Sequence, residues 1–234
     1  MNLKKICKHL IPAIKCIFDF RKEPLRFPWR NLRTQKVSPW HVSIGEILLN
    51  KVNTNRVLII YYKLLSTYPT PCELANASPD KIEHMLKPLG LQHKKTLTLI
   101  EVSRLLCEEK DIEILKQKLK KVKGIGKNTY NAILLFGFDE PRPLMDGVIG
   151  RVLKRIFGFN WKKRFYEDKN AWNFSEQLLK CSIKNGFDPK IFYYNLLDIG
   201  REICLHRKPL CKQCSCNAIC KYYKSKEKLS QASF

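Results

Sequence analysis

The chain has 234 residues, of which 44% are hydrophobic and 11% aromatic, and this composition excludes a protein that is mainly disordered. Lys and Arg number 44 against 21 Asp and Glu, which gives a net charge of +23. So large a basic excess excludes an ordinary enzyme of small acidic metabolites and indicates a polyanionic partner such as nucleic acid.

The first twenty residues predict an amphipathic helix instead of a secretory signal, because Lys and His interrupt apolar residues that recur at helical spacing. These apolar positions are Leu3, Ile6, Leu10, Ile14 and Phe18. Uninterrupted apolar runs elsewhere are far shorter than the roughly 20 residues of a membrane-spanning helix. We therefore expect no membrane association and a reducing, cytoplasmic compartment in which cysteines bind metal more often than they form disulfides.

Helical spacing recurs along the chain, whereas the alternation typical of strands is hard to find. One example is the set Ile149, Val152, Leu153 and Ile156, which follows Asp146. The sequence therefore predicts an all-α fold.

A glycine-rich turn is predicted between two helices at Gly124-Ile125-Gly126, with Thr129 and an apolar run at 132–136 behind it. Glycines let the backbone approach a phosphate closely, and the first turn of the following helix presents free N–H groups. An ordinary turn is the alternative, and the basic charge of the chain favours phosphate binding.

Asp146 precedes the helix predicted at 148–157 and follows a loop at 139–143. Asp is among the commonest residues that cap a helix N-terminus. A carboxylate at this place can also serve catalysis, and the two roles are compatible.

Four cysteines near the C-terminus have the spacing C-x6-C-x2-C-x5-C, formed by Cys204, Cys211, Cys214 and Cys220. Thiolates this close together suit a tetrahedral metal or an iron–sulfur cluster, and the spacing does not separate zinc from iron–sulfur. Cys216 lies within the segment and is an alternative ligand. The other five are expected to be buried small hydrophobic residues, namely Cys7, Cys16, Cys72, Cys107 and Cys181.

Taken in order, KGIGKNT at 123–129, MDG at 145–147 and the four cysteines resemble the helix-hairpin-helix DNA glycosylases of the endonuclease III and MutY superfamily. Upstream, FPWR at 27–30, SPW at 38–40 and GEILL at 45–49 resemble the mismatch-specific branches, MutY and the archaeal thymine mismatch glycosylases.

The resemblance implies a six-helix barrel domain at 39–150 that contains the hairpin. It also implies a second helical domain, formed by 1–38 and 151–234, that holds a [4Fe-4S] cluster on the four cysteines. It is this resemblance, and not the spacing, that selects iron–sulfur over zinc. The active site is expected between the two domains.

The resemblance also implies the catalytic roles. A glycosylase must extrude its target nucleotide from the duplex before it reacts. Asp146 matches the catalytic aspartate, which stabilises the oxocarbenium-like sugar and orients or activates water. Glu46 matches the glutamate that supplies a proton or hydrogen bond to the departing base, and a solvated helix face is the alternative for it.

Asn128 occupies the position at which endonuclease III enzymes have the lysine that forms a Schiff base. Lys127 lies one residue earlier, about 100° away around the helix, and is expected to face phosphate. We therefore predict a monofunctional enzyme. The same position is typically tyrosine in the thymine mismatch enzymes and serine in MutY, so Asn128 leaves the substrate open.

Further DNA contacts are expected from three segments. The loop with Asn50, Lys51 and Asn53 matches the place where the family inserts residues into the gap left by the flipped base, with a polar loop as the alternative. The turn at Gly90 precedes Lys94 and Lys95, which are expected near phosphates or on a solvated surface. The third segment is the basic loop at 205–210, with Arg207 and Lys208. Together with the hairpin, the predicted DNA-binding residues include Gly124, Ile125, Gly126, Lys127, Thr129, Asn50, Lys51, Arg207 and Lys208.

The leading hypothesis is a base-excision-repair DNA glycosylase that removes thymine or uracil opposite guanine and leaves an abasic site. The alternative hypothesis is a MutY-like enzyme. The end of the chain fourteen residues after Cys220 weakens it, whereas the motif MDG resembles MutY more closely. That rival removes adenine opposite guanine or 8-oxoguanine, and a second alternative is a non-catalytic DNA-binding module. The expected partner is double-stranded DNA with a mismatched or damaged base, bound by a monomer associated with the nucleoid.

Overall fold

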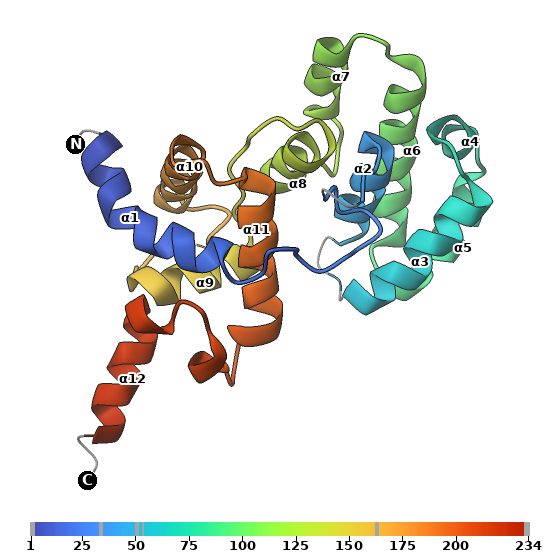
Figure 1. Ribbon diagram of the computed structural model, residues 1–234. Helices are drawn as coiled ribbons and strands as arrows, with labels where there is room; N and C mark the ends of the chain where they lie inside the picture. Colours follow the sequence, from blue (N-terminus) through green and yellow to red (C-terminus); the bar gives the residue numbers. More distant parts are fainter. Residues whose placement is uncertain (1–2, 33–34, 50–51, 53, 162–163, 232–234) are drawn as a thin grey trace. The chain divides into compact units, whose positions relative to one another are not determined.

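The computed structural model describes residues 3–32, 35–49, 52, 54–161 and 164–231 (Figure 1). Every regular element within these ranges is helical, and no strand occurs in them, which confirms the predicted all-α class. None of the helices described there is long and apolar enough to cross a membrane.

The chain divides into two compact units. The central unit comprises 27–140, and the terminal unit comprises 1–26 together with 141–234, so both chain ends belong to the same unit. The boundaries expected from the sequence are 39 and 150 instead. In the structure, Asp146 belongs to the terminal unit and Glu46 to the central unit.

In the described part of the central unit, seven α-helices pack around a core rich in Leu, Ile and aromatic side chains. They are α2 (Pro39–Leu48), α3 (Thr54–Thr67), α4 (Pro71–Ala75), α5 (Pro79–Leu86), α6 (Gln92–Glu108), α7 (Ile112–Leu119) and α8 (Lys127–Ala132). A short 3₁₀ turn spans Lys87–Leu89, and a π-helical turn, Ile133–Gly137, continues α8. Proline at the first helical position begins α2, α4 and α5, where its missing N–H costs nothing.

The aromatic motif around Trp29 packs against α2. A Cβ on Gly45 would lie 2.2 Å from Trp29 Cγ, so only glycine lets the helix approach the indole this closely. Trp29 also contacts Tyr61 at a ring-centroid distance of 5.0 Å, and the buried Arg30 lies over the Phe27 ring. Because Glu46 follows Gly45, this packing positions the helix that presents Glu46.

Five α-helices occur among the residues of the terminal unit that the structure describes, and the first of them, α1, packs against α10 and α11 (Figure 1). They are α1 (Leu3–Phe18), α9 (Gly147–Phe157), α10 (Lys169–Lys184), α11 (Pro189–Asp198) and α12 (Lys221–Gln231). A π-helical turn follows α11 at Ile199–Ile203, and two 3₁₀ turns occur at Cys211–Gln213 and Asn217–Ile219. The amphipathic helix predicted for the first twenty residues is confirmed, with Leu10, Ile14 and Ile17 buried.

Three disulfides correct the predictions made for six cysteines. The pairs are Cys7–Cys181, Cys16–Cys216 and Cys72–Cys107, with Cα–Cα distances of 5.3, 5.2 and 5.0 Å. Cys7, Cys16, Cys72, Cys107 and Cys181 were expected to be buried small hydrophobic residues; Cys7 and Cys181 are buried, but all five are paired, and Cys216 is paired instead of being an alternative ligand. The prediction rested on the expected compartment, whereas pairing depends on Cα atoms lying about 5.5 Å apart. Only the fold brings residues 35 to 200 positions apart to that distance.

Candidate functional site

The predicted hairpin is present between α7 and α8. Ile125 N–H donates to Val122 O at 3.1 Å, which closes the turn. Gly124 has a φ of +99°, a conformation that favours glycine, and a Cβ there would lie 2.2 Å from Thr98 Oγ1. Gly126 caps the N-terminus of α8 in an extended conformation. Gly124 is thus required by its backbone geometry and by a close neighbour, whereas a Cβ on Gly126 would meet no atom within 4 Å.

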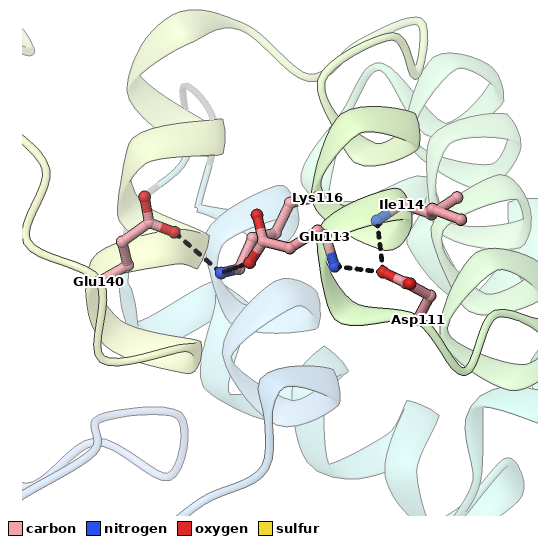
Figure 2. Close-up of polar contacts among 5 residues, drawn as sticks. All are labelled: Asp111, Glu113, Ile114, Lys116 and Glu140. Atoms are coloured by element: carbon pink, nitrogen blue, oxygen red, sulfur yellow. Dashed lines mark hydrogen bonds and ion pairs between the residues drawn. The ribbon is translucent and has the colours of Figure 1, made fainter.

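The first helix of the hairpin is held at its N-terminus and along its length (Figure 2). Asp111 Oδ1 accepts hydrogen bonds from the N–H groups of Glu113 and Ile114 at 2.8 and 3.0 Å. Lys116 pairs with Glu113 at 2.8 Å and with Glu140, beyond α8, at 3.1 Å, and these carboxylates raise the pKa of the Lys116 ammonium. Lys116 therefore links α7 to the segment that follows α8.

The residues that begin α8 differ in their exposure. Lys127 is exposed, whereas Asn128 and Thr129 are half-buried. This difference agrees with the prediction that Lys127 and Asn128 face different surroundings around the helix. An exposed ammonium beside the N-terminal end of a helix suits an anionic ligand.

Asp146 is the N-cap of α9, as predicted. Its Oδ1 accepts hydrogen bonds from the N–H groups of Val148 and Ile149 at 2.8 and 2.7 Å. Its Oδ2 has no hydrogen bond to another residue that the structure describes. Burial raises the pKa of the carboxyl, and the two backbone N–H groups and the charges of Arg201 and Arg151 oppose that rise. One oxygen thus orients the carboxylate while the other is available for chemistry.

Glu46 is half-buried on α2, between the buried Gly45 and Ile47. Glu46 is thus neither buried nor fully exposed, and its predicted catalytic role stays a prediction. The loop after α2 contains Asn50, Lys51 and Asn53, which lie outside the described residues, so their predicted contacts stay predictions.

The turn before α6 has an unusual backbone. Gly90 has a φ of +68° and Leu91 a φ of +54°, a region that costs a residue with a Cβ about 1–2 kcal/mol. The Leu91 side chain is 48% exposed despite being apolar. Strain combined with an exposed apolar side chain is a pattern found at binding sites, and nothing in the local sequence singled Leu91 out.

Lys95 does not lie where the sequence predicted. It is 5% exposed, and its Nζ donates a hydrogen bond to Leu48 O at 3.0 Å. Burial lowers the pKa of its ammonium to about 8. A buried group cannot contact phosphate, so that prediction was wrong for Lys95, whereas Lys94 is exposed.

The four predicted ligands line one pocket in the terminal unit. Cys204, Cys211, Cys214 and Cys220 are free thiols that surround it together with apolar side chains such as Val152, Ile156 and Ile199. Burial raises the pKa of the thiols of Cys211, Cys214 and Cys220, and neighbouring thiolates add to the rise. Among the described residues, no three His, Cys, Asp or Glu side chains are grouped so as to hold a metal ion.

Two arginines of α9, one turn apart, hold the segment that begins at Cys204. Arg151 Nε donates to Cys204 O at 2.9 Å. Arg155 Nη1 donates to Leu205 O at 2.7 Å, and its Nη2 donates to His206 O at 2.9 Å. The same helix therefore begins at Asp146 and contacts the cysteine segment. Sequence reasoning missed these roles, although spacing of four residues places both side chains on one helix face.

Arg207 and Lys208 are exposed in the loop between Cys204 and Cys211. Their neighbours Leu205 and His206 are fixed through their carbonyl groups by Arg155. The two cations thus project from a segment whose backbone is anchored, which suits contact with a phosphate backbone.

The chain matches the HhH-GPD superfamily base excision DNA repair protein family over residues 44–176. It is 34% identical over 199 residues to the thymine-DNA glycosylase of Aeropyrum pernix, which covers 84% of this chain and 86% of that protein. It is 31% identical over 242 residues to the thymine/uracil-DNA glycosylase of Pyrobaculum aerophilum, which covers 96% of this chain and all of that protein.

A solved structure of a thermostable thymine-DNA glycosylase superimposes with a TM-score of 0.76 at 25% identity, covering 96% of this chain and 100% of that chain. The chain belongs to the HhH-GPD superfamily of base excision DNA repair proteins. The family resemblance stated from the motifs is thereby confirmed.

Proposed function

We propose that this protein is a monofunctional DNA glycosylase that hydrolyses the N-glycosidic bond of thymine or uracil opposite guanine. The observation that supports this most directly is the arrangement of Asp146, with Oδ1 fixed by two backbone N–H groups and Oδ2 available. The relatives from Aeropyrum pernix and Pyrobaculum aerophilum support the choice of thymine and uracil.

Asp146 acts on the sugar of the extruded nucleotide. As the glycosidic bond breaks, positive charge develops on the deoxyribose ring, and a fixed carboxylate stabilises it without reorganising. The same carboxylate accepts a proton from the water that attacks the sugar carbon. Burial raises its proton affinity, which favours that transfer.

Glu46 assists the departing base. A half-buried glutamate is a suitable donor of a proton or hydrogen bond to a pyrimidine oxygen. Asn128 supplies one acceptor and two donors that fit the edge of a pyrimidine. An amide forms no Schiff base with the sugar, so the product is an abasic site with an intact strand.

The hairpin, the basic loop before Cys211 and the turn before α6 bind the duplex. The hairpin residues Gly124 to Thr129 contact one stretch of backbone, and Arg207 and Lys208 contact another. We propose that the exposed Leu91 inserts into the base stack, as apolar side chains do when they unstack a duplex.

The cysteine pocket suits a [4Fe-4S] cluster. Its donors are thiols alone, its walls are largely apolar, and the other six cysteines are paired in disulfides. The resemblance to the endonuclease III superfamily favours the cluster over zinc. The cluster would bind four thiolates and hold the loop at 204–220. Purified protein is then expected to contain about four iron atoms and as much acid-labile sulfide per chain, whereas stoichiometric zinc would contradict the assignment.

The test of the reaction uses end-labelled duplexes with G·T, G·U, A·G and A·8-oxoguanine, resolved with and without hot alkali. Breaks only after alkali, in the thymine or uracil strand, are expected. Breaks in the adenine strand would favour a MutY-like activity, and breaks without alkali would refute the monofunctional mechanism. If no duplex is broken, the result would favour the alternative of a non-catalytic DNA-binding module. Asp146→Asn, prepared identically, serves as the control for contaminating activity.

A further inference from the structure

Lys95 is a buried cation that has no role in the proposed reaction. It lies in the first turn of α6, it is 5% exposed, and its Nζ donates to the carbonyl of Leu48. Leu48 is the last residue of α2. Within the residues described, this is the one hydrogen bond that the ammonium makes.

A charged group in this place is costly for folding. Burial lowers the pKa of the ammonium to about 8, which means that the folded protein disfavours the charge. A methionine would fill a similar volume without that cost. The hydrogen bond itself has a clear reason, because the last carbonyls of a helix lack intrahelical partners and attract a cation.

The bond joins two segments that carry residues of the proposed function. Leu48 follows Glu46 by two residues. Lys95 follows the strained turn at Gly90 and Leu91 by four residues. The contact at 3.0 Å therefore joins the end of α2 to the beginning of α6 by a hydrogen bond, in addition to the apolar packing between the two helices.

The next turn of α6 makes a second contact of the same kind. Thr98 Oγ1 lies 2.9 Å from Lys123 O and 2.9 Å from Lys94 O, so its one hydroxyl proton is shared between them. Lys123 precedes Gly124, and a Cβ at Gly124 would meet the Thr98 hydroxyl. Helix α6 thus contacts the hairpin three residues after it contacts the end of α2.

We propose that Lys95 is a positioning residue that, together with Thr98, holds the C-terminal end of α2, which carries Glu46, and the hairpin in a fixed relation required for extruding the target nucleotide. The proposal rests on the proposed function and adds a role that is distinct from contact with DNA. Binding of an undistorted duplex depends on phosphate contacts, whereas extrusion requires the inserted residues and the phosphate-binding turns to act at one place. Loss of Lys95 should therefore impair extrusion more than binding.

The experiment compares Lys95→Met, Lys95→Arg and Thr98→Val with Arg104→Met, which removes one exposed charge from the same helix. Single-turnover rates are measured on a G·U duplex and on a substrate whose uracil lies in an unpaired bubble, where extrusion costs little. 2-Aminopurine beside the uracil reports extrusion by fluorescence, and binding is titrated against salt.

Lys95→Met is expected to lower the rate on the G·U duplex about 10- to 100-fold and the fluorescence change in parallel, with a near wild-type rate on the bubble. Its salt slope is expected to equal that of the wild type, whereas removing a cation that neutralises a phosphate would reduce the slope by about 0.9. Lys95→Arg should restore most of the rate, Thr98→Val should show a smaller loss on the duplex only, and Arg104→Met should match the wild type.

Equal losses on the duplex and the bubble, a reduced salt slope, or wild-type behaviour of Lys95→Met would each overturn the positioning role. If Lys95→Met does not fold, the duplex-only loss in Thr98→Val decides the question. Failure of the proposed function is distinguishable, because the wild type would then excise uracil from neither substrate.

Discussion

Removing the Cys72–Cys107 disulfide should lower the stability of the protein by an amount that the structure allows us to calculate. The bond links α4 to the end of α6 across 35 residues. In the chain-entropy treatment, a closed loop of this length restricts the unfolded chain by about 4 kcal/mol at 25 °C. Cys72 is exposed and Cys107 half-buried, so serine at both positions leaves no apolar cavity to add to that figure.

The assay is thermal and denaturant unfolding of oxidised wild type, reduced wild type and Cys72→Ser/Cys107→Ser. The double variant should melt about 8–15 °C below the oxidised wild type, since 1 kcal/mol corresponds to about 2–4 °C at this size. Reduced wild type should melt lower still, because it also loses the two disulfides of the terminal unit. Cys72→Ser alone is the matched control and should equal the double variant.

Alkylation of the unfolded, unreduced protein followed by mass measurement checks the bond directly. Cys72 and Cys107 should resist alkylation until a reductant is added. A double variant as stable as oxidised wild type, or alkylation of both thiols without reduction, would refute the reasoning.

Asp146→Asn should lower the single-turnover rate about 10³-fold with no loss of melting temperature, since asparagine also caps helices well. Because the pKa of this carboxyl is raised, the folded wild type binds more protons than the unfolded chain just above the ordinary carboxyl pKa. The contribution of this carboxyl to stability should therefore fall and the activity rise as pH increases through that range, so the free energy of unfolding of the wild type should fall relative to that of the variant. Gly124→Ala should cost about 1–3 kcal/mol of stability and weaken DNA binding, because its φ is +99° and Thr98 leaves no room for a Cβ; an unchanged melting curve would contradict this. Arg207→Ala/Lys208→Ala should reduce the salt slope of DNA binding by about 0.9 for each phosphate that is no longer neutralised, and an unchanged slope would remove that loop from the interface.

Local patterns in the sequence were sufficient to predict a structural feature wherever that feature is formed by a single segment. The hairpin glycines, the cap at Asp146 and the amphipathic helix at the N-terminus each depend on residues within one or two turns. The four cysteines that line one pocket are also close in sequence. Such features can be predicted because backbone conformation, capping and helical periodicity act over a few residues.

Contacts between distant segments were decided only by the tertiary structure. The pairing of Cys16 with Cys216 spans 200 residues, and nothing near either cysteine indicates its partner. Lys95 belongs to a basic stretch that predicts exposure, yet its ammonium is buried against Leu48. The physical reason is the same in both cases. A disulfide forms, or an ammonium donates to the last carbonyl of a helix, only where the two groups lie within a few ångström of each other. Those distances are set by the packing of the whole chain.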